Sequence, residues 1–316
     1  MELIHKRTHI DFVKLTPYSL FLSAVILIAG LVSYLYQGLN YGIDFSGGIS
    51  IQLRFDAPAP IGPIRSSLDE MHLGDVVIQE FGSPNEVLLR IEAQKDESRK
   101  QSELAKEIVR KLAPLNVAGK DLEVRRVEFV GPQVGSELAW QGIMAVLYSL
   151  VAILIYVGWR FEWRFALGAV LALFHDVLCT VGLFSILQEE FTLTIVAALL
   201  TILGYSINDT IVVYDRIRDE MMRLKSAPMA VVINEAINLT LSRTIITSGT
   251  VVLVLLGLFF VGGEVIHGFA LALLFGVGLG TLSSVFVAAP VVLLLDPYMK
   301  SGRRMGSKEV AEGEQP

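Results

Sequence analysis

Two aspartates stand inside otherwise apolar stretches of the sequence, and their side chains are the best placed to do chemistry. Asp209 lies in LGYSINDTIVVYDRIRDE (203–220), and Asp176 follows His175 in another long apolar run. An aspartate near the centre of a membrane-spanning helix costs roughly 2.5–3.5 kcal/mol, so such residues are functional by default. A carboxyl group in this setting can take up and release a proton. The sequence therefore predicts a proton-coupled function centred on Asp209.

Helical spacing brings several polar side chains close to Asp209. On a helix of 3.6 residues per turn, Tyr205 and Arg216 share its face, and Ser206 lies beside it. Arg243 begins the next apolar run, and an arginine side chain is long enough to reach inward toward the acid. An acid with an arginine partner and neighbouring hydroxyl groups has the composition of a protonatable relay.

Hydroxyl groups continue beyond Arg243, and structural alternatives stay open for the charged residues. Thr247 and Thr250 extend a hydroxylated stripe along the face of Arg243. The alternative for Arg243 is an anchor at the membrane surface, and for Asp209 a structural acid hydrogen-bonded to another helix. For Asp176 and the histidine before it, a proton-pathway role competes with a satisfied structural pair.

Other kinds of chemistry are not indicated by the sequence. It contains no GxxxxGK[ST] phosphate loop, no HExxH zinc pair and no GxSxG nucleophile motif. Its one cysteine, Cys179, cannot form an intramolecular disulfide and is interpreted as a small apolar filler. We therefore expect a protein that is not an enzyme and that binds no metal ion, cofactor or nucleic acid.

The elements that hold these residues follow from composition. Of the 316 residues, 53% are hydrophobic and only 18% are charged, which is typical of a membrane protein rather than a soluble domain. A helix needs about 20 apolar residues to cross the hydrocarbon core of a bilayer. The sequence therefore predicts an α-helical multi-pass membrane protein with six transmembrane helices. The six apolar runs are 18–36, 138–158, 165–187, 191–214, 244–262 and 266–294.

The distribution of Lys and Arg predicts the orientation, because these residues are retained on the cytoplasmic side. The N-terminal tail and the long connection after the fourth span are rich in them, whereas the short connections near 188–190 and 262–265 have none. The expected parts are a cytoplasmic tail (1–17), transmembrane helix 1 (18–37), an extracytoplasmic α+β domain (38–137), helices 2–6 (138–295) with a cytoplasmic amphipathic connection (215–243), and a cytoplasmic tail (296–316).

The domain between the first two spans reads as a β-α-β-β-α-β unit. Alternating apolar and polar residues from Ile49 to Asp56 predict a strand, and a helix follows Pro63. Two strands then form a hairpin about the turn 83–85, and a helix near 98–113 precedes a last strand over 121–130. The alternation of that strand slips at Arg125-Arg126, which indicates a bulge. This order is that of a ferredoxin-like domain.

The connection after the fourth span is expected to contain a helix of its own. Met229, Ile233, Ile237 and Leu241 recur every four residues, which predicts an amphipathic helix over 222–242 lying on the cytoplasmic face of the membrane.

Glycine clusters indicate backbone turns and close helix packing. Gly47 and Gly48 are expected to form a turn into the first strand. Gly276, Gly278 and Gly280 predict that the last span approaches a neighbouring helix closely.

Five short motifs, taken in order, carry a family resemblance. They are GIDFSGG (42–48), VGPQVGSEL (130–138), FHD (174–176), GYSINDTIVVYDRIRDE (204–220) and LSRTIITS (241–248). Together with six spans they resemble the SecF family of protein translocase subunits, within the superfamily of resistance-nodulation-division transporters. The resemblance covers residues 40–295. It implies that the glycine-rich motifs have structural roles, at Gly42, Asp44, Gly47, Gly48, Gly131, Pro132 and Gly135.

The resemblance also implies a function, partners and a location. Such a protein is half of a twelve-helix unit whose other half is SecD. It uses the proton motive force in the bacterial inner membrane to assist a preprotein through the SecYEG channel after the SecA motor, with YajC as a further partner. The acid of the family's NDT motif and the arginine of its SRT motif, which carry proton coupling, correspond to Asp209 and Arg243. Asn208 is implied as a hydrogen-bonding neighbour.

Two other functions stay open. A small-molecule or lipid exporter of the same superfamily would use the same acid, but it normally needs larger external domains. A scaffold that only stabilises the channel would not need Asp209.

Overall fold

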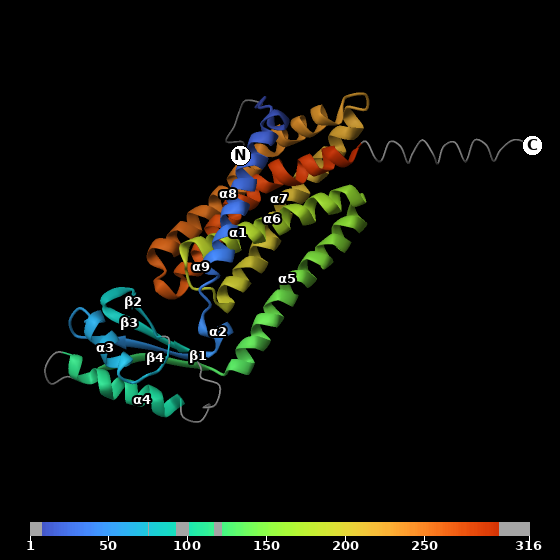
Figure 1. The fold of residues 1–316 in the computed structure, drawn as a ribbon. Helices are drawn as coiled ribbons and strands as arrows, with labels where there is room; N and C mark the ends of the chain where they lie inside the picture. Colours follow the sequence, from blue (N-terminus) through green and yellow to red (C-terminus); the bar gives the residue numbers. More distant parts are fainter. Residues whose placement is uncertain (1–7, 75, 93–100, 117–121, 297–316) are drawn as a thin grey trace, which may run out of the picture.

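The computed structural model describes residues 8–74, 76–92, 101–116 and 122–296. Figure 1 shows a bundle of long helices with a small α+β domain attached at one end. Within the described ranges, six helices are long and apolar enough to cross a membrane, which confirms the predicted number of spans. They are α1 (Phe12–Gln37), α5 (Pro132–Arg160), α6 (Trp163–Leu187), α7 (Leu193–Arg223), α8 (Met229–Val261) and α9 (Glu264–Ser283), the last extended by a π-helical segment, η2 (Ser284–Ala288).

Several helices extend beyond the apolar runs that predict them, as at the starts of α1, α5 and α8 and at the end of α7. Helix α1 begins at Phe12, before the apolar run 18–36, and Asp11 there accepts a hydrogen bond from the backbone N–H of Lys14 at 3.0 Å. Hydropathy marks the part of a helix that suits lipid, whereas capping groups decide where the helix begins.

The prediction of an amphipathic helix on the membrane surface is wrong. Helix α7 continues to Arg223, and α8 begins at Met229 directly after Pro228 and runs unbroken to Val261. Met229 and Ile233 are buried in an apolar cluster that includes residues of α1, α6 and α7. The four-residue spacing therefore marks the inward face of a long bundle helix. The segment 215–243 is the end of α7, a short turn and the first part of α8.

The α+β domain has the predicted order of elements. It contains a short α2 (Ile43–Ser46), then β1 (Gly48–Arg54), α3 (Ile61–Asp69), β2 (Val76–Phe81), β3 (Ser83–Glu92), α4 (Gln101–Leu112) and β4 (Glu123–Val130). The four strands form one antiparallel sheet in the order β2-β3-β1-β4, which confirms the ferredoxin-like expectation.

Strand details agree with the alternation of the sequence, with one shift at the hairpin. The register of β4 against β1 slips between Gln52 and Leu53 and skips Arg125, where the bulge is predicted. The turn between β2 and β3 lies at Gly82 (φ 72°) rather than over 83–85, because only a glycine adopts this left-handed conformation without strain. Alternate residues of β1 pack against α3 and α4 in the core of the domain.

Candidate functional site in the helix bundle

Asp209 lies in the interior of the bundle and is only 2% exposed. Helix α7 carries it, and hydroxyl groups from two other helices surround it. Its carboxylate accepts hydrogen bonds from Ser248 of α8 at 3.2 Å and from Thr281 of α9 at 3.5 Å. These two hydroxyl groups are also 2.8 Å from each other. The acid therefore joins three helices.

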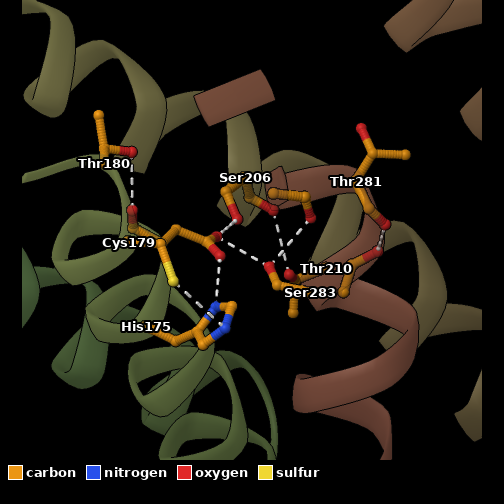
Figure 2. A network of polar contacts seen from close by, with 10 residues as sticks. His175, Cys179, Thr180, Ser206, Thr210, Thr281 and Ser283 are labelled. Atoms are coloured by element: carbon orange, nitrogen blue, oxygen red, sulfur yellow. Dashed lines mark hydrogen bonds and ion pairs between the residues drawn. The ribbon is translucent and has the colours of Figure 1, made fainter. Parts of the chain in front are cut away.

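Asp176 forms a second acidic centre and is fully buried. Figure 2 shows the side chains around this centre, among them His175, Ser206 and Ser283. The Oδ2 atom of Asp176 accepts hydrogen bonds from Ser206 of α7 at 2.7 Å and from Ser283 of α9 at 2.8 Å. Its Oδ1 lies 3.0 Å from Nδ1 of His175, whose Nε2 is 3.6 Å from the sulfur of Cys179. The predicted pairing of Asp176 with His175 is present in the structure, and the interpretation of Cys179 as apolar filler needs correction, because its thiol contacts the imidazole.

The two acidic centres share the same supporting helices. Ser206 on α7 contacts Asp176 and lies one turn before Asp209, and α9 supplies one hydroxyl group to each acid. Helix α9 comes close because Gly280 has no side chain: a Cβ there would lie 2.9 Å from the Cβ of Ser206. Gly276 packs equally closely against α7, whereas Gly278 has no atom within 4 Å of its Cβ position, so the prediction holds for two of the three glycines.

The side chains predicted from helical spacing around Asp209 are placed differently from expectation. Arg243 is exposed and makes no ion pair with Asp209, although its charge is near enough to act on the carboxylate. Arg216 does not face Asp209, since it forms an ion pair with Glu220 at 2.9 Å. Thr247 donates to the backbone oxygen of Arg243 on its own helix at 3.0 Å.

Two other expected neighbours also lie outside the hydrogen-bond network of Asp209. Asn208 is exposed at the surface of α7. The hydroxyl group of Tyr205 is buried and has no hydrogen-bond partner among the described residues.

The sequence reasoning missed the three hydroxyl donors Ser248, Thr281 and Ser283. The predicted stripe of hydroxyl groups on α8 starts from Arg243 and lies one residue away from the face that is buried in the bundle. That buried face runs through Thr240, Thr244 and Ser248. A recurrence of Thr and Ser every four residues was the available signal.

The GIDFSGG motif forms the joint between the bundle and the α+β domain. Asp44 of α2 accepts a hydrogen bond from the backbone N–H of Leu193 at 2.9 Å, so it satisfies a free donor at the start of α7. The backbone N–H of Gly42 donates to the carbonyl oxygen of Phe191 at 2.9 Å, and that of Phe191 donates to Asn40 at 2.8 Å. The motif is thereby fixed to the beginning of the helix that carries Asp209.

The second glycine motif packs against the first. Gly47 has a φ of 71°, and a Cβ there would lie 2.8 Å from Cα of Pro132, the first residue of α5 after Gly131. A Cβ on Gly135 would lie 2.8 Å from the carbonyl oxygen of Phe45. The expected turn into the first strand lies at Gly47, and Gly48, which has a φ of 134°, is already the first residue of β1, where it passes close to the backbone of β3.

An ion pair that sequence reasoning missed also holds this joint. Arg90 of β3 is buried and lies 3.2 Å from Glu190 in the turn between α6 and α7. It also donates to the carbonyl oxygen of Tyr41 at 3.3 Å and to the side chain of Asn40 at 3.2 Å. Burial raises the pKa of Glu190, and the neighbouring Arg90 charge partly offsets this. Within the described residues, no group of three or more His, Cys, Asp or Glu could hold a metal ion.

Two family models match parts of the chain. The family described as "Protein export membrane protein SecD/SecF, C-terminal" matches residues 111–297, and the one described as "SecD/SecF GG Motif" matches residues 37–59. The second match coincides with the joint.

Relatives with curated names are similar over almost their full length. Protein translocase subunit SecF of Magnetococcus marinus is 55% identical over 99% of both chains. The SecF protein of Vibrio alginolyticus is 44% identical over 93% of this chain and 92% of its own, and that of Escherichia coli O157:H7 is 39% identical over 99% and 95%.

Solved structures show the same arrangement of elements. The crystal structure of SecDF, a translocon-associated membrane protein from Thermus thermophilus, matches 94% of this chain with a TM-score of 0.81 and 37% identity. A structure of SecDF in a super-membrane-facing form matches 97% with a TM-score of 0.69 and 36% identity. This chain spans 40% and 41% of those two longer chains.

Proposed function

The chain belongs to the SecD/SecF family of protein-export membrane proteins, and from this premise we propose that Asp209 couples proton movement to protein export. The chain is a multi-pass membrane protein and an accessory subunit of Sec protein translocation. We further propose that it hydrolyses no ATP, and that the energy comes from the proton motive force.

The surroundings of Asp209 support this role. Its hydrogen-bond partners are the hydroxyl groups of Ser248 and Thr281, with no ion pair to a cation among the described residues. A hydroxyl group can donate to a carboxylate and can also accept from a protonated carboxyl group. Both protonation states of Asp209 can therefore be satisfied with small rotations of the same side chains. This property is the observation that carries the proposal.

The energy available is sufficient for a conformational change. One proton that crosses 100 mV supplies about 2.3 kcal/mol. This energy shifts a two-state equilibrium roughly fifty-fold. Protonation of Asp209 removes its attraction to Arg243 and changes the packing of α7, α8 and α9.

The joint gives a route from α7 to the α+β domain. Asp44 caps the first turn of α7, and Arg90 joins the sheet to Glu190 in the turn before that helix. A shift of α7 along or around its axis therefore displaces the α+β domain. We infer that this movement acts on the emerging preprotein.

We propose that SecD is the partner that covers the exposed polar groups of α7 and α8. Asn208 on α7 and both Arg243 and Thr250 on α8 are exposed although they lie in or beside apolar spans. Polar groups at this depth are costly in lipid and normally face another helix. The family further supports the SecYEG channel, SecA and YajC as partners, the bacterial inner membrane as the location, cytoplasmic termini and an extracytoplasmic domain at 38–137.

The proposal is tested by measuring proton flux in vesicles that contain this chain with SecD and the SecYEG channel, while an unfolded polypeptide occupies that channel. Asp209→Asn keeps the size of the side chain and removes its titration, so we expect proton flux to fall to background. Asp215→Asn is the matched control, because Asp215 lies on the same helix but is about half exposed, next to Arg160.

Assembly with SecD is measured in parallel, so that a folding defect is not mistaken for a loss of coupling. Unchanged flux in a correctly assembled Asp209→Asn complex would contradict the proposal and move the coupling acid to Asp176 or to SecD.

A further inference from the structure

A large apolar cavity lies on the side of the bundle nearest the α+β domain. Its volume is about 720 Å³, within the roughly 300–1,000 Å³ of pockets that hold small ligands. The cavity separates α1 from α5: both helices pack along α6, but they make few direct contacts with each other. Figure 1 shows α5 leaving the rest of the bundle toward α2.

The walls of the cavity continue the lipid-facing surface of the bundle. Ile28 and Leu31 of α1 line one side, Ile143 and Leu147 of α5 line the other, and all four are strongly exposed. The floor is formed by Val177 of α6 and Leu199 of α7, which are buried in the bundle core. The opening between α1 and α5 therefore faces the medium that surrounds apolar spans, which is lipid.

The end of the cavity near the domain has a different character. Tyr34 and Tyr41 lie there close enough to interact, and Phe45 and Ser46 of α2 complete the lining. Tyrosines are enriched where the hydrocarbon of a bilayer meets the headgroups. The cavity thus runs from the apolar middle of the bundle to the depth at which a lipid headgroup lies.

The lining decides between possible occupants. Water needs two to four polar partners, and most of this lining offers none. A helix of a partner protein is the other candidate occupant, and the test below distinguishes it from lipid. A single hydrocarbon chain is narrow and flexible enough to enter between α1 and α5.

We propose that this cavity is a binding site for one acyl chain of a phospholipid from the leaflet on the side of the α+β domain. The chain lies between α1 and α5 on the floor made by Val177 and Leu199, and the headgroup lies near Tyr34 and Tyr41. Since the lipid contacts Phe45 in the GIDFSGG motif, it fills the space beneath the joint. The site does not depend on proton coupling by Asp209.

The test uses this chain assembled with SecD in vesicles of phosphatidylethanolamine and phosphatidylglycerol, with a small fraction of phosphatidylethanolamine that carries a photoreactive diazirine in one acyl chain. After illumination, the cross-linked residues are identified by peptide mass spectrometry. A lipid that merely surrounds the protein labels exposed positions only. The proposal expects label on the buried residues Val177 and Leu199.

Two variants that fill the cavity make the test specific. Val146→Phe and Ala139→Phe place a ring in the cavity from α5. Both should reduce the labelling of Val177 and Leu199 by about tenfold or more, the factor expected when roughly two methylene groups lose their contacts. Val151→Phe is the matched control, because this exposed residue of α5 lies outside the cavity. It should leave the labelling unchanged.

Three outcomes would overturn the proposal. The first is labelling confined to exposed residues, and the second is equal labelling of the floor in the wild-type protein and in both filled variants that still assemble with SecD. The third is cross-linking of the floor to SecD or to the preprotein instead of lipid, which would make the cavity a protein-binding site.

Discussion

In the proposed mechanism, the hydroxyl groups around Asp209 leave it free to change its protonation state, whereas a direct arginine partner would hold it ionised. Ser248 and Thr281 contact Asp209, and Ser206 and Ser283 contact Asp176. In a low-dielectric interior, an uncompensated carboxylate is costly and a tightly paired one is hard to protonate. The arrangement with Arg243 nearby but outside contact lies between these extremes.

Ser248→Ala tests the hydroxyl group that connects α8 to the acid. The substitution removes a hydrogen bond to a charged group, which contributes about 1.5–3 kcal/mol, so we expect proton flux to fall about tenfold or more. Thr247→Ala is the control, because Thr247 bonds only the backbone of its own helix. Proton flux in SecD-containing vesicles measures both, and equal rates in the two variants would show that Ser248 is only a packing residue.

The sequence predicted the two acids and their helices but not the residues that contact them. Asp209 and Asp176 were found because a charged side chain in an apolar run is rare. Ser248 and Ser283 are not rare in this way, since serine is common in membrane helices. The packing of α8 against α7 selects Ser248, and the packing of α9 against α6 selects Ser283. Arg243 was placed too close to Asp209, because helical spacing fixes a face on one helix but not the distance between helices.

At the scale of elements, the turn between α6 and α7 is as important as the helices themselves. It receives Arg90 from β3, and Phe191, which follows Glu190, accepts a hydrogen bond from the backbone N–H of Gly42 in the GIDFSGG motif. The ferredoxin-like order and the six spans followed from periodicity and length. The docking of the ferredoxin-like domain on the six spans could not be predicted in this way, because it depends on pairs of residues far apart in the sequence.

Arg90→Ala tests this docking. The loss leaves Glu190 and two acceptor oxygens in a largely buried joint without their donor, which should weaken the attachment by about 1–3 kcal/mol. We expect faster hydrogen exchange of backbone amides in 40–48, while exchange in the core of the sheet stays unchanged. Arg54→Ala serves as the control, because its contact with Glu86 lies on the domain surface. Equal exchange in both variants would contradict a role of Arg90 in the joint.

At the scale of the whole molecule, the bundle exposes polar groups at membrane depth and is therefore expected to be completed by a partner. Gly204 lies one turn before Asn208 on the same exposed face of α7, and a Cβ there would meet no atom within 4 Å. The surface around Gly204 and Asn208 is therefore uncovered in the isolated chain. The longer SecDF chains, of which this chain matches 40% and 41%, contain further residues that could cover such a face.

Gly204→Phe tests this face. The ring does not disturb the chain itself, but it occupies space that a partner helix needs, so co-purification with SecD should fall at least about tenfold, as expected for an interface that loses 1.4 kcal/mol or more. Ile155→Phe is the control on the exposed side of α5. Full assembly of the Gly204→Phe variant would show that SecD binds elsewhere.

The first helix has a consequence for how the protein is made. Its start is fixed by Asn234 and Asn238 of α8, and the backbone N–H of Phe12 donates to Asn234 at 2.7 Å across 222 residues of sequence. At roughly 5–20 residues per second, a ribosome takes about ten to forty-five seconds to synthesise that interval. The first helix therefore enters the bilayer long before its partner exists, and the bundle closes only late in translation.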